Sequence, residues 1–314
     1  MDKISTIEKA MERVGDTVDP AVAVSAPVDH PATEAAAPTG ETSVTRAIAG
    51  DAPASGTVAT PASTVPSTAR TVHLDLDRLE KMNYITHEGE RTLLAEEYRL
   101  IKRPLLANAF GKNADLIEHG NLIMVTSARA GEGKTFTSVN LAMSIAMEMD
   151  RTVLLVDADV GRPRVHQILG TPLGPGLIDL LLDDSLDVAD VMLKTNVPKL
   201  SLIPMGRYHD HSTELLASQE MLRLTGELAG RYPDRVVIFD APPLLITSEA
   251  VVLAGLMGQI VFVVLAEKTP RAAVRDALSL LDANKPIGLV LNKCRRTPGD
   301  SYGYGYGYGA SGKS

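Results

Sequence analysis

The residues at 131–135, Gly-Glu-Gly-Lys-Thr, have the types and spacing of a phosphate-binding loop (P-loop). Glycines let backbone N–H groups converge on phosphate oxygens, and the positive end of a following helix strengthens the attraction. Lys134 is placed to reach the terminal phosphates of a nucleotide, and the hydroxyl of Thr135 to bind Mg²⁺. The motif follows an apolar run at 122–126 and opens a helical pattern, although Ala128 replaces the usual first glycine. The expected nucleotide contacts are Ala130, Gly131, Glu132, Gly133, Lys134, Thr135 and Phe136.

Two further apolar runs end in aspartate. The run at 152–156 ends in Asp157 and Asp159, and the run at 236–239 ends in Asp240. At the carboxyl ends of parallel strands these carboxylates face the ligand crevice. There they can lie near Mg²⁺ or take a proton from an attacking hydroxyl. The expected catalytic residues are Lys134, Asp157, Asp159 and Asp240, and the expected metal ligands are Thr135, Asp157, Asp159 and Asp240.

The elements that must position these residues alternate along the chain. Strands are expected at 122–126, 152–156, 200–203, 236–239, 260–265 and 288–291, and helices at about 90–109, 134–148, 213–229 and 270–283. Such alternation predicts an α/β fold of the P-loop NTPase kind, a mainly parallel sheet with helices on both faces. The most apolar run, at 250–266, contains Gln259 and two glycines, so it is interpreted as a helix end followed by a buried strand.

Composition divides the 314 residues into three parts. Residues 1–73 contain no leucine and no aromatic residue, which predicts a disordered linker, with a short amphipathic helix at 3–14. Residues 74–298 form the expected P-loop domain. In the tail at 299–314 four tyrosines alternate with glycine, which opposes both helix and packed strand. They are Tyr302, Tyr304, Tyr306 and Tyr308.

Charge and cysteine content argue against some classes of function. The formal net charge is −8, which does not favour a nucleic-acid partner. The single cysteine, Cys294, excludes a disulfide framework and an iron–sulfur cluster held by one chain. The first fifteen residues lack the apolar region of a signal peptide, so a cytoplasmic location is expected.

The P-loop, the pair Asp157/Asp159, the Asp240-Ala-Pro-Pro strand end and the tyrosine tail together resemble the bacterial tyrosine kinases. The resemblance covers about 90–308 and is strongest to the subgroup linked to exopolysaccharide export in bacteria that sort proteins with a PEP-type C-terminal signal. It implies an ATP- and Mg²⁺-dependent protein-tyrosine autokinase. Asp157 would activate the acceptor hydroxyl and Asn292 would read adenine. The implied acceptors are Tyr302, Tyr304, Tyr306 and Tyr308.

The same resemblance implies self-association into a ring-like homo-oligomer through Glu96, Arg99 and Lys102. The family has arginine at the third of these positions, and lysine lacks the bidentate fork of arginine. A membrane polysaccharide copolymerase is the implied partner, through which the kinase would regulate exopolysaccharide synthesis and export. The chain would then be cytoplasmic and peripheral to the inner membrane.

Two other functions remain open at this point. One is a positioning or partitioning ATPase of the same superfamily, although such proteins usually carry lysine where Arg129 stands and have no reason for a tyrosine tail. The other is a non-catalytic interaction module gated by ATP. Nucleotide-binding residues alone do not distinguish this module from a kinase, because binding does not prove transfer.

Overall fold

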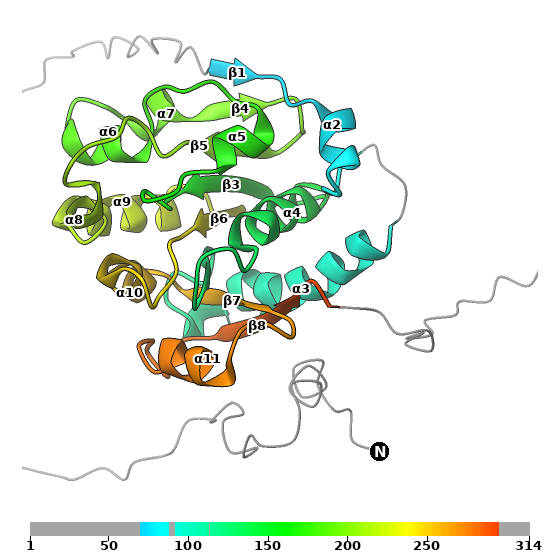
Figure 1. Cartoon of the computed structure of the whole chain (residues 1–314). Helices are drawn as coiled ribbons and strands as arrows, with labels where there is room; N and C mark the ends of the chain where they lie inside the picture. Colours follow the sequence, from blue (N-terminus) through cyan, green and yellow to red (C-terminus); the bar gives the residue numbers. More distant parts are fainter. Residues whose placement is uncertain (1–69, 88–91, 113, 295–314) are drawn as a thin grey trace, which may run out of the picture. The chain divides into compact units, whose positions relative to one another are not determined.

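The computed structural model describes residues 70–87, 92–112 and 114–294. Its centre is an eight-stranded sheet with the order β1-β4-β5-β3-β6-β2-β7-β8 (Figure 1). Every neighbouring pair of strands is parallel except β4 and β5. The strands are β1 (Arg70–Val72), β2 (Leu122–Ser127), β3 (Thr152–Asp157), β4 (Leu193–Thr195), β5 (Leu200–Ile203), β6 (Arg235–Asp240), β7 (Gln259–Leu265) and β8 (Ile287–Asn292). The predicted α/β fold with a mainly parallel sheet is confirmed.

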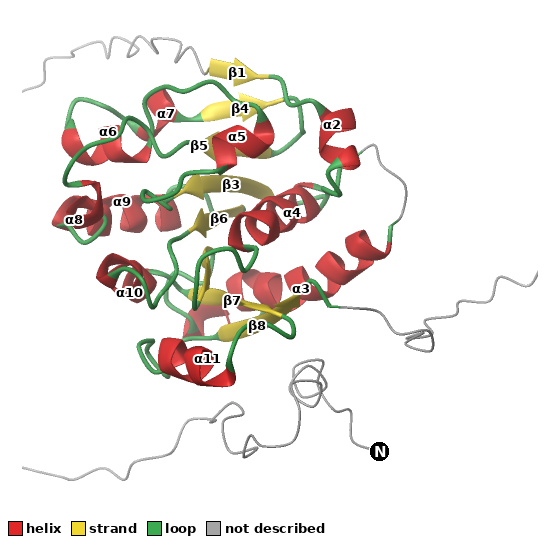
Figure 2. Ribbon diagram, in the orientation of Figure 1, coloured by secondary structure: helices red, strands yellow, loops and turns green. Residues whose placement is uncertain are grey.

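Helices pack on both faces of the sheet (Figure 2). One face carries α2 (Leu76–Lys81), α3 (Leu93–Phe110), α4 (Lys134–Ala146) and α5 (Val165–Leu169). The other carries α6 (Leu177–Leu182), α7 (Val188–Val191), α8 (Ser212–Leu215), α9 (Gln219–Gly230), α10 (Ser248–Leu256) and α11 (Arg271–Leu278). A short 3₁₀ turn, η1 (Ala114–Leu116), follows α3.

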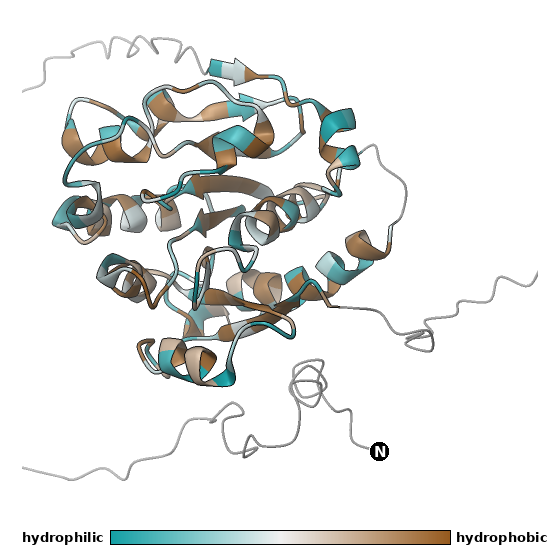
Figure 3. Ribbon diagram, in the orientation of Figure 1, coloured by the Kyte–Doolittle hydropathy of each residue, from teal (hydrophilic) through white to brown (hydrophobic). Residues whose placement is uncertain are grey.

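The central strands are apolar along their whole length because both of their faces are buried. In β2, Leu122 and Met124 face the core under α9 and α10, whereas Ile123 and Val125 face the core under α3 and α4. Figure 3 shows this apolar character in the brown ribbon of β3, β6 and β7. Strands of this kind form a rigid frame whose carboxyl ends hold the loops of the site.

All six strands expected from the sequence are present, and the run at 250–266 is α10 followed by β7, as interpreted. The single helix expected at 213–229 was wrong, because the structure has two helices there, α8 and α9. Ser218 separates them: its hydroxyl accepts the N–H of Met221 at 3.2 Å and so begins α9. Strands β1 and β4, of three residues each, were not predicted.

Strand β1 is held at its edge by a side chain from a distant turn. The N–H of Leu74 donates to Oδ1 of Asn196 at 2.7 Å, and Nδ2 of Asn196 donates to the Leu74 carbonyl at 3.1 Å. The amide thus replaces a ladder bond just beyond the strand. None of the helices described here is long and apolar enough to cross a membrane. The predicted helix at 3–14, the tail and the predicted linker up to residue 69 lie outside the described residues, whereas residues 70–73 of that linker contain β1.

Candidate active site

The P-loop joins the central strand β2 to α4 (Figure 1). Gly131 and Gly133 have φ values of +84° and +104°, in the left-handed region that a side chain disfavours. Gly133 is the N-cap of α4, so the two glycines turn the chain directly into the first turn of the helix. The loop's N–H groups and the positive end of α4 are therefore available to an anion.

Neighbouring segments fix the shape of this loop. The buried carboxylate of Glu132 accepts the N–H of Arg129 at 2.9 Å and the hydroxyl of Thr269, which follows β7. Nδ2 of Asn292, the last residue of β8, donates to the Glu132 carbonyl at 2.9 Å. A Cβ atom on Gly133 would lie 1.9 Å from Asn292 Nδ2. Glu132 and Asn292 thus support the loop backbone, and adenine recognition by Asn292 stays a prediction.

The predicted acidic residues converge beside Lys134. Asp157 and Asp240 are register partners in β3 and β6, and β6 in turn pairs with β2. The Lys134 ammonium lies 3.5 Å from Oδ2 of Asp159. The hydroxyl of Ser138, one turn along α4, donates to Oδ1 of Asp240 at 3.0 Å. Three separate sequence motifs therefore meet at one end of the sheet.

Burial changes the proton affinity of two of these carboxyls. Burial, followed by the negative charge of Asp159, raises the pKa of Asp240 to about 6, against opposing contributions from Thr135, Lys134 and Ser138. Burial and the nearby Asp240 raise the pKa of Asp157 well above its ordinary value. Asp157 nonetheless accepts backbone N–H groups from Asp159 at 3.3 Å and Val165 at 3.1 Å. Such perturbed groups are typical of catalytic sites.

The donor set suits a hard divalent cation. Oδ2 of Asp240 is buried and has no hydrogen-bond partner among the described residues, so it has a free acceptor position. Thr135, with its hydroxyl, and Asp159, with its carboxylate, are among the residues that line the adjoining cavity. Oxygen ligands of this kind match Mg²⁺, which keeps several waters and binds through one or two carboxylates plus substrate phosphates.

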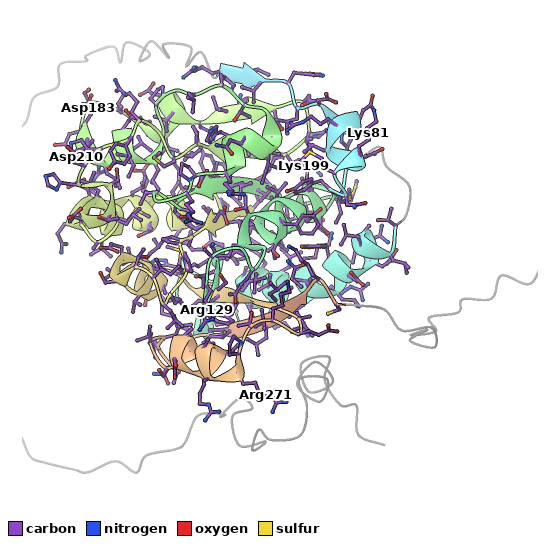
Figure 4. The ribbon with its side chains drawn as sticks, in the orientation of Figure 1. Lys81, Arg129, Asp183, Lys199, Asp210 and Arg271 are labelled. Carbon is purple, nitrogen blue, oxygen red and sulfur yellow. The ribbon has the colours of Figure 1, made fainter. Side chains whose placement is uncertain are left out.

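A cavity of about 410 Å³ opens at this point. Of the predicted site residues, its lining includes Ala130, Gly131, Gly133, Lys134, Thr135, Phe136 and Asp159. Glu132, Asp157, Asp240 and Asn292 are not part of the lining. Arg129, labelled in Figure 4, lies on the P-loop beside these lining residues.

Some lining residues were not found from the sequence. Tyr84 lies over Phe136 with ring centroids 5.1 Å apart, and burial raises its pKa. Arg162 and Arg164 line the cavity from the loop after β3. No signal near the P-loop motif identifies Tyr84, because it precedes that motif by a whole helix. Ser138 could have been predicted from the sequence, because it lies one helical turn after Lys134.

The three residues expected to support oligomerisation do not lie together. Glu96 and Arg99 form an ion pair on the solvent side of α3. Lys102 is buried against α4, where its ammonium donates to the Ser144 carbonyl at 2.5 Å and pairs with Glu148 at 2.6 Å. An intersubunit role for Glu96, Arg99 and Lys102 stays a prediction, and Lys102 already has partners in its own chain.

Comparison with known proteins decides the family. The family model described as an AAA domain matches residues 120–268. The tyrosine-protein kinase YwqD of Bacillus subtilis is 31% identical over 224 residues, which cover 70% of this chain and 90% of YwqD. The chain belongs to the bacterial tyrosine-protein kinases. CpsD of Streptococcus agalactiae, another tyrosine-protein kinase, has the same identity and covers 69% of this chain and 90% of its own length.

Solved structures of the kinases agree with this family. The VpsO kinase domain superposes with a TM-score of 0.55 at 28% identity, covering 65% of this chain and 97% of that domain. The chimerical protein CapA2B2, at 22% identity and a TM-score of 0.58, shares the fold. Some kinases of the family are much longer: EpsB of Ralstonia nicotianae is 34% identical over 174 residues, and the matched chain spans only 23% of it.

Proposed function

We propose that this bacterial tyrosine kinase is an ATP-dependent autokinase that phosphorylates its own C-terminal tyrosines, Tyr302, Tyr304, Tyr306 and Tyr308. The observation that carries the proposal is the convergence of Lys134, Asp159 and Asp240 at one P-loop. Buried carboxyls with raised proton affinity beside a P-loop fit a site that takes up a proton during transfer. Membership in the kinase family favours transfer to a protein over the positioning ATPase.

The proposed reaction is an in-line transfer. The phenolic oxygen of the acceptor forms a bond to the γ-phosphorus of ATP, the bond from that phosphorus to the β–γ bridging oxygen breaks, and ADP leaves. The phenolic proton goes to one carboxylate, that of Asp157. Asp159 reaches the cavity wall, and the raised pKa of Asp157 favours it as the holder of the proton.

Positive charge opposes the negative charge that the reaction spreads over the phosphate oxygens. Lys134 and the loop N–H groups provide it from the protein. Mg²⁺, held by Thr135 and Asp240 with Asp159 nearby, would supply further charge neutralisation at the phosphates. The buried frame of strands keeps these groups in place without reorganisation at the moment of transfer.

The acceptor tail is proposed to come from a neighbouring copy in a ring-like homo-oligomer. Phosphates on adjacent tyrosines repel one another and nearby acids, so phosphorylation should loosen that assembly. The proposed partner is the membrane polysaccharide copolymerase that the sequence resemblance implies, which would hold the kinase at the cytoplasmic face of the inner membrane and link it to exopolysaccharide export.

The deciding experiment incubates the full chain with ATP and Mg²⁺ and measures the C-terminal peptide by mass spectrometry. Phosphate is expected on one or more of the four tail tyrosines. The matched control is Lys134→Ala, which removes the contact to the terminal phosphates and should leave the tail unmodified. A mixture of tagged Lys134→Ala chain and untagged active chain then tests transfer between copies, since only the latter can modify the former.

An unmodified tail, even with the cytoplasmic segment of the copolymerase present, would contradict the autokinase. Binding of a fluorescent ADP analogue in that same sample would then support the ATP-gated module instead. The assembly is measured separately, by light scattering before and after ATP. A particle mass that never exceeds one chain in the presence of the partner would contradict the ring.

A further inference from the structure

Tyr208 differs in its exposure from the other tyrosines in the described part of the chain. It has 75% of its surface exposed, whereas Tyr84 has 8% and Tyr98 has 3%. Tyr232 is partly buried, and the guanidinium carbon of Arg235 lies 3.8 Å from its ring centroid. A kinase needs direct access to the phenolic oxygen, so among the described residues Tyr208 is the tyrosine that is open to modification.

The two buried tyrosines are fixed by packing. The ring of Tyr84 lies against Phe136 with centroids 5.1 Å apart. Burial raises the pKa of Tyr98, against the effect of a side-chain hydrogen bond with Thr137 of α4. Exposing either phenol would require the segments before α4 to separate from it. Their packing accounts for these two rings, and it does not account for the ring of Tyr208.

The backbone immediately before Tyr208 is held in place by α6. The N–H of Arg207 donates to Oδ2 of Asp179 at 3.0 Å, and Nε of Arg207 donates to Oδ1 of the same carboxylate at 2.6 Å. Asp179 is buried and also accepts the N–H of Gly176 at 2.9 Å. The chain that leaves β5 is therefore fastened one residue before the exposed ring.

The backbone after Tyr208 is fastened as well. The N–H of His209 donates to Oγ of Ser212 at 3.1 Å, and the N–H of Ser212 donates back to the His209 carbonyl at 3.0 Å. Ser212 is buried at the start of α8. Tyr208 itself makes no hydrogen bond, ion pair or ring contact with another described residue. The loop thus presents one free tyrosine side chain between two anchored points.

This loop lies at the same end of the sheet as the catalytic cavity but outside the cavity. It follows β5, which is parallel to β3, and Thr213 of the next helix lines the cavity. Tyr208 is not part of the lining. Figure 4 shows Asp210, two residues further along, at the margin of the molecule. Because the backbone is anchored on both sides, the hydroxyl stays outside its own site, and a phosphate must come from another molecule.

We propose that Tyr208 is a further phospho-acceptor of this kinase, modified by a second copy of the chain. The inference rests on the autokinase chemistry proposed above. The phenolic oxygen of Tyr208 forms a bond to the γ-phosphorus of ATP bound in the second copy, and the bond from that phosphorus to the β–γ bridging oxygen breaks. ADP leaves, and the phenolic proton passes to Asp157 of the second copy. The product carries a charge of about −1.5 to −2 on the folded surface.

Tryptic peptides make the modification readable without the tail. Cleavage after Arg207 and Arg223 yields residues 208–223, in which Tyr208 is the only tyrosine. After incubation of the full chain with ATP and Mg²⁺, mass spectrometry should find one phosphate on this peptide, and fragmentation should place it on Tyr208. The matched control is the peptide 232–235, which contains the covered Tyr232 and should carry no phosphate.

Two variants complete the design. Tyr208→Phe should lose the phosphate of the 208–223 peptide and keep phosphate on the tail. Tagged Lys134→Ala chain should stay unmodified alone and gain phosphate on Tyr208 when it is mixed with untagged active chain. A tagged chain that gains phosphate on its tail but not on Tyr208 would contradict transfer between copies at this position.

The outcomes separate the two proposals. A phosphorylated tail with an unmodified 208–223 peptide overturns Tyr208 as an acceptor and leaves the autokinase standing. Phosphate on Tyr208 with an unmodified tail removes the tail acceptors and keeps Tyr208. No phosphate on either segment overturns both proposals. Equal phosphate on Tyr208 and Tyr232 would overturn the selection by exposure on which the inference depends.

Discussion

The side-chain amide of Asn292 donates to the carbonyl of Glu132 at 2.9 Å, so the end of β8 touches the centre of the P-loop. The contact exists because Gly133 has no side chain at that point. Strand β8 therefore helps to hold the P-loop, the segment that is proposed to bind the nucleotide phosphates.

Replacement of Gly133 by alanine should strongly weaken nucleotide binding. The added Cβ would lie 1.9 Å from Asn292 Nδ2, at a φ of +104° that disfavours any side chain. Gly133→Ala is expected to lose at least a hundredfold in ADP affinity, and Asn292→Ala about two- to fivefold, in titrations with a fluorescent ADP analogue. The double variant should recover part of the loss, because the clash is gone while the backbone strain of about 1–3 kcal/mol remains. Simple additivity of the two effects would contradict direct contact.

Metal binding should weaken in mild acid. Mg²⁺ requires ionised carboxylates, and burial raises the pKa of Asp240 to about 6. As pH falls through about 6, Asp240 takes a proton and Mg²⁺ affinity should drop by about tenfold for each further pH unit. The measurement is Mg²⁺-dependent ADP binding across the range. Because the carboxyls of Asp157 and Asp240 interact, the pH midpoint of this loss of Mg²⁺ affinity describes the two groups together and not Asp240 alone.

The same pKa gives a sign for stability. The pKa of Asp240 is higher in the folded chain than in the unfolded chain, where it is about 3.9, so protonation of Asp240 favours the folded state. This contribution to the free energy of unfolding is complete below about pH 4 and is lost as the pH rises through about 6. Asp240→Asn should therefore flatten both pH dependences. A Mg²⁺ affinity that stayed constant down to about pH 5 in the unsubstituted chain would contradict the raised pKa.

Substitution of Lys102 separates packing from oligomerisation. Its buried ammonium holds the Ser144 carbonyl and the half-exposed Glu148 within one chain. Lys102→Ala should cost about 2 kcal/mol of unfolding free energy, which lowers Tm by about 4–8 °C in a domain of this size. Circular dichroism provides the melting curve. The control is Arg99→Ala on the exposed side of α3, which should leave Tm nearly unchanged. A Lys102→Ala chain with normal Tm and altered particle mass would favour an intersubunit role instead.

The two aspartates after β3 should differ in their kinetic signatures. Asp159→Asn removes the partner of Lys134 on the cavity wall, so both ADP affinity and the rate of tail phosphorylation are expected to change. Asp157→Asn should lower the rate by about 10²–10⁴-fold with ADP affinity nearly constant, if Asp157 holds the transferred proton.

Stability serves as the check on Asp157, because its carboxylate accepts the N–H groups of Asp159 and Val165. An amide in that place loses one acceptor and costs about 1–3 kcal/mol. The rate comparison is therefore made well below the melting temperature of the variant. Equal rate losses in both variants, with equal losses of ADP affinity, would contradict a distinct role for Asp157.

Sequence patterns predicted those parts of the site that lie within a single segment of the chain. The P-loop is a local strand–turn–helix unit, and Asp157 and Asp240 each end an apolar run, so their shared edge followed from the parallel sheet. Tyr84 and Asn292 were different, because their contacts with Phe136 and Glu132 depend on how distant segments pack. Periodicity along one segment contains no information about such pairs.

Short elements at the edge of the sheet could not be predicted from the sequence for a related reason. Strand β1 has three residues, and its register is completed by the amide of Asn196 from another turn. Three residues are too few for a recognisable alternation. Lys102 likewise fits the pattern of a solvated helix face, and only the packing of α3 on α4 shows that it is buried.

The strand order also sets the distance between the first and the last described residues, measured across the sheet. Strands β1 and β8 are the two edges of the sheet, so Arg70 and Cys294 leave the described structure on opposite sides, separated by seven strand spacings of about 4.8 Å, or about 34 Å along the sheet. A dye attached at Arg70 is thus kept on the opposite side of the sheet from a dye attached at Cys294. Energy transfer between a donor dye at one of these positions and an acceptor dye at the other therefore reports whether the whole width of the sheet is intact.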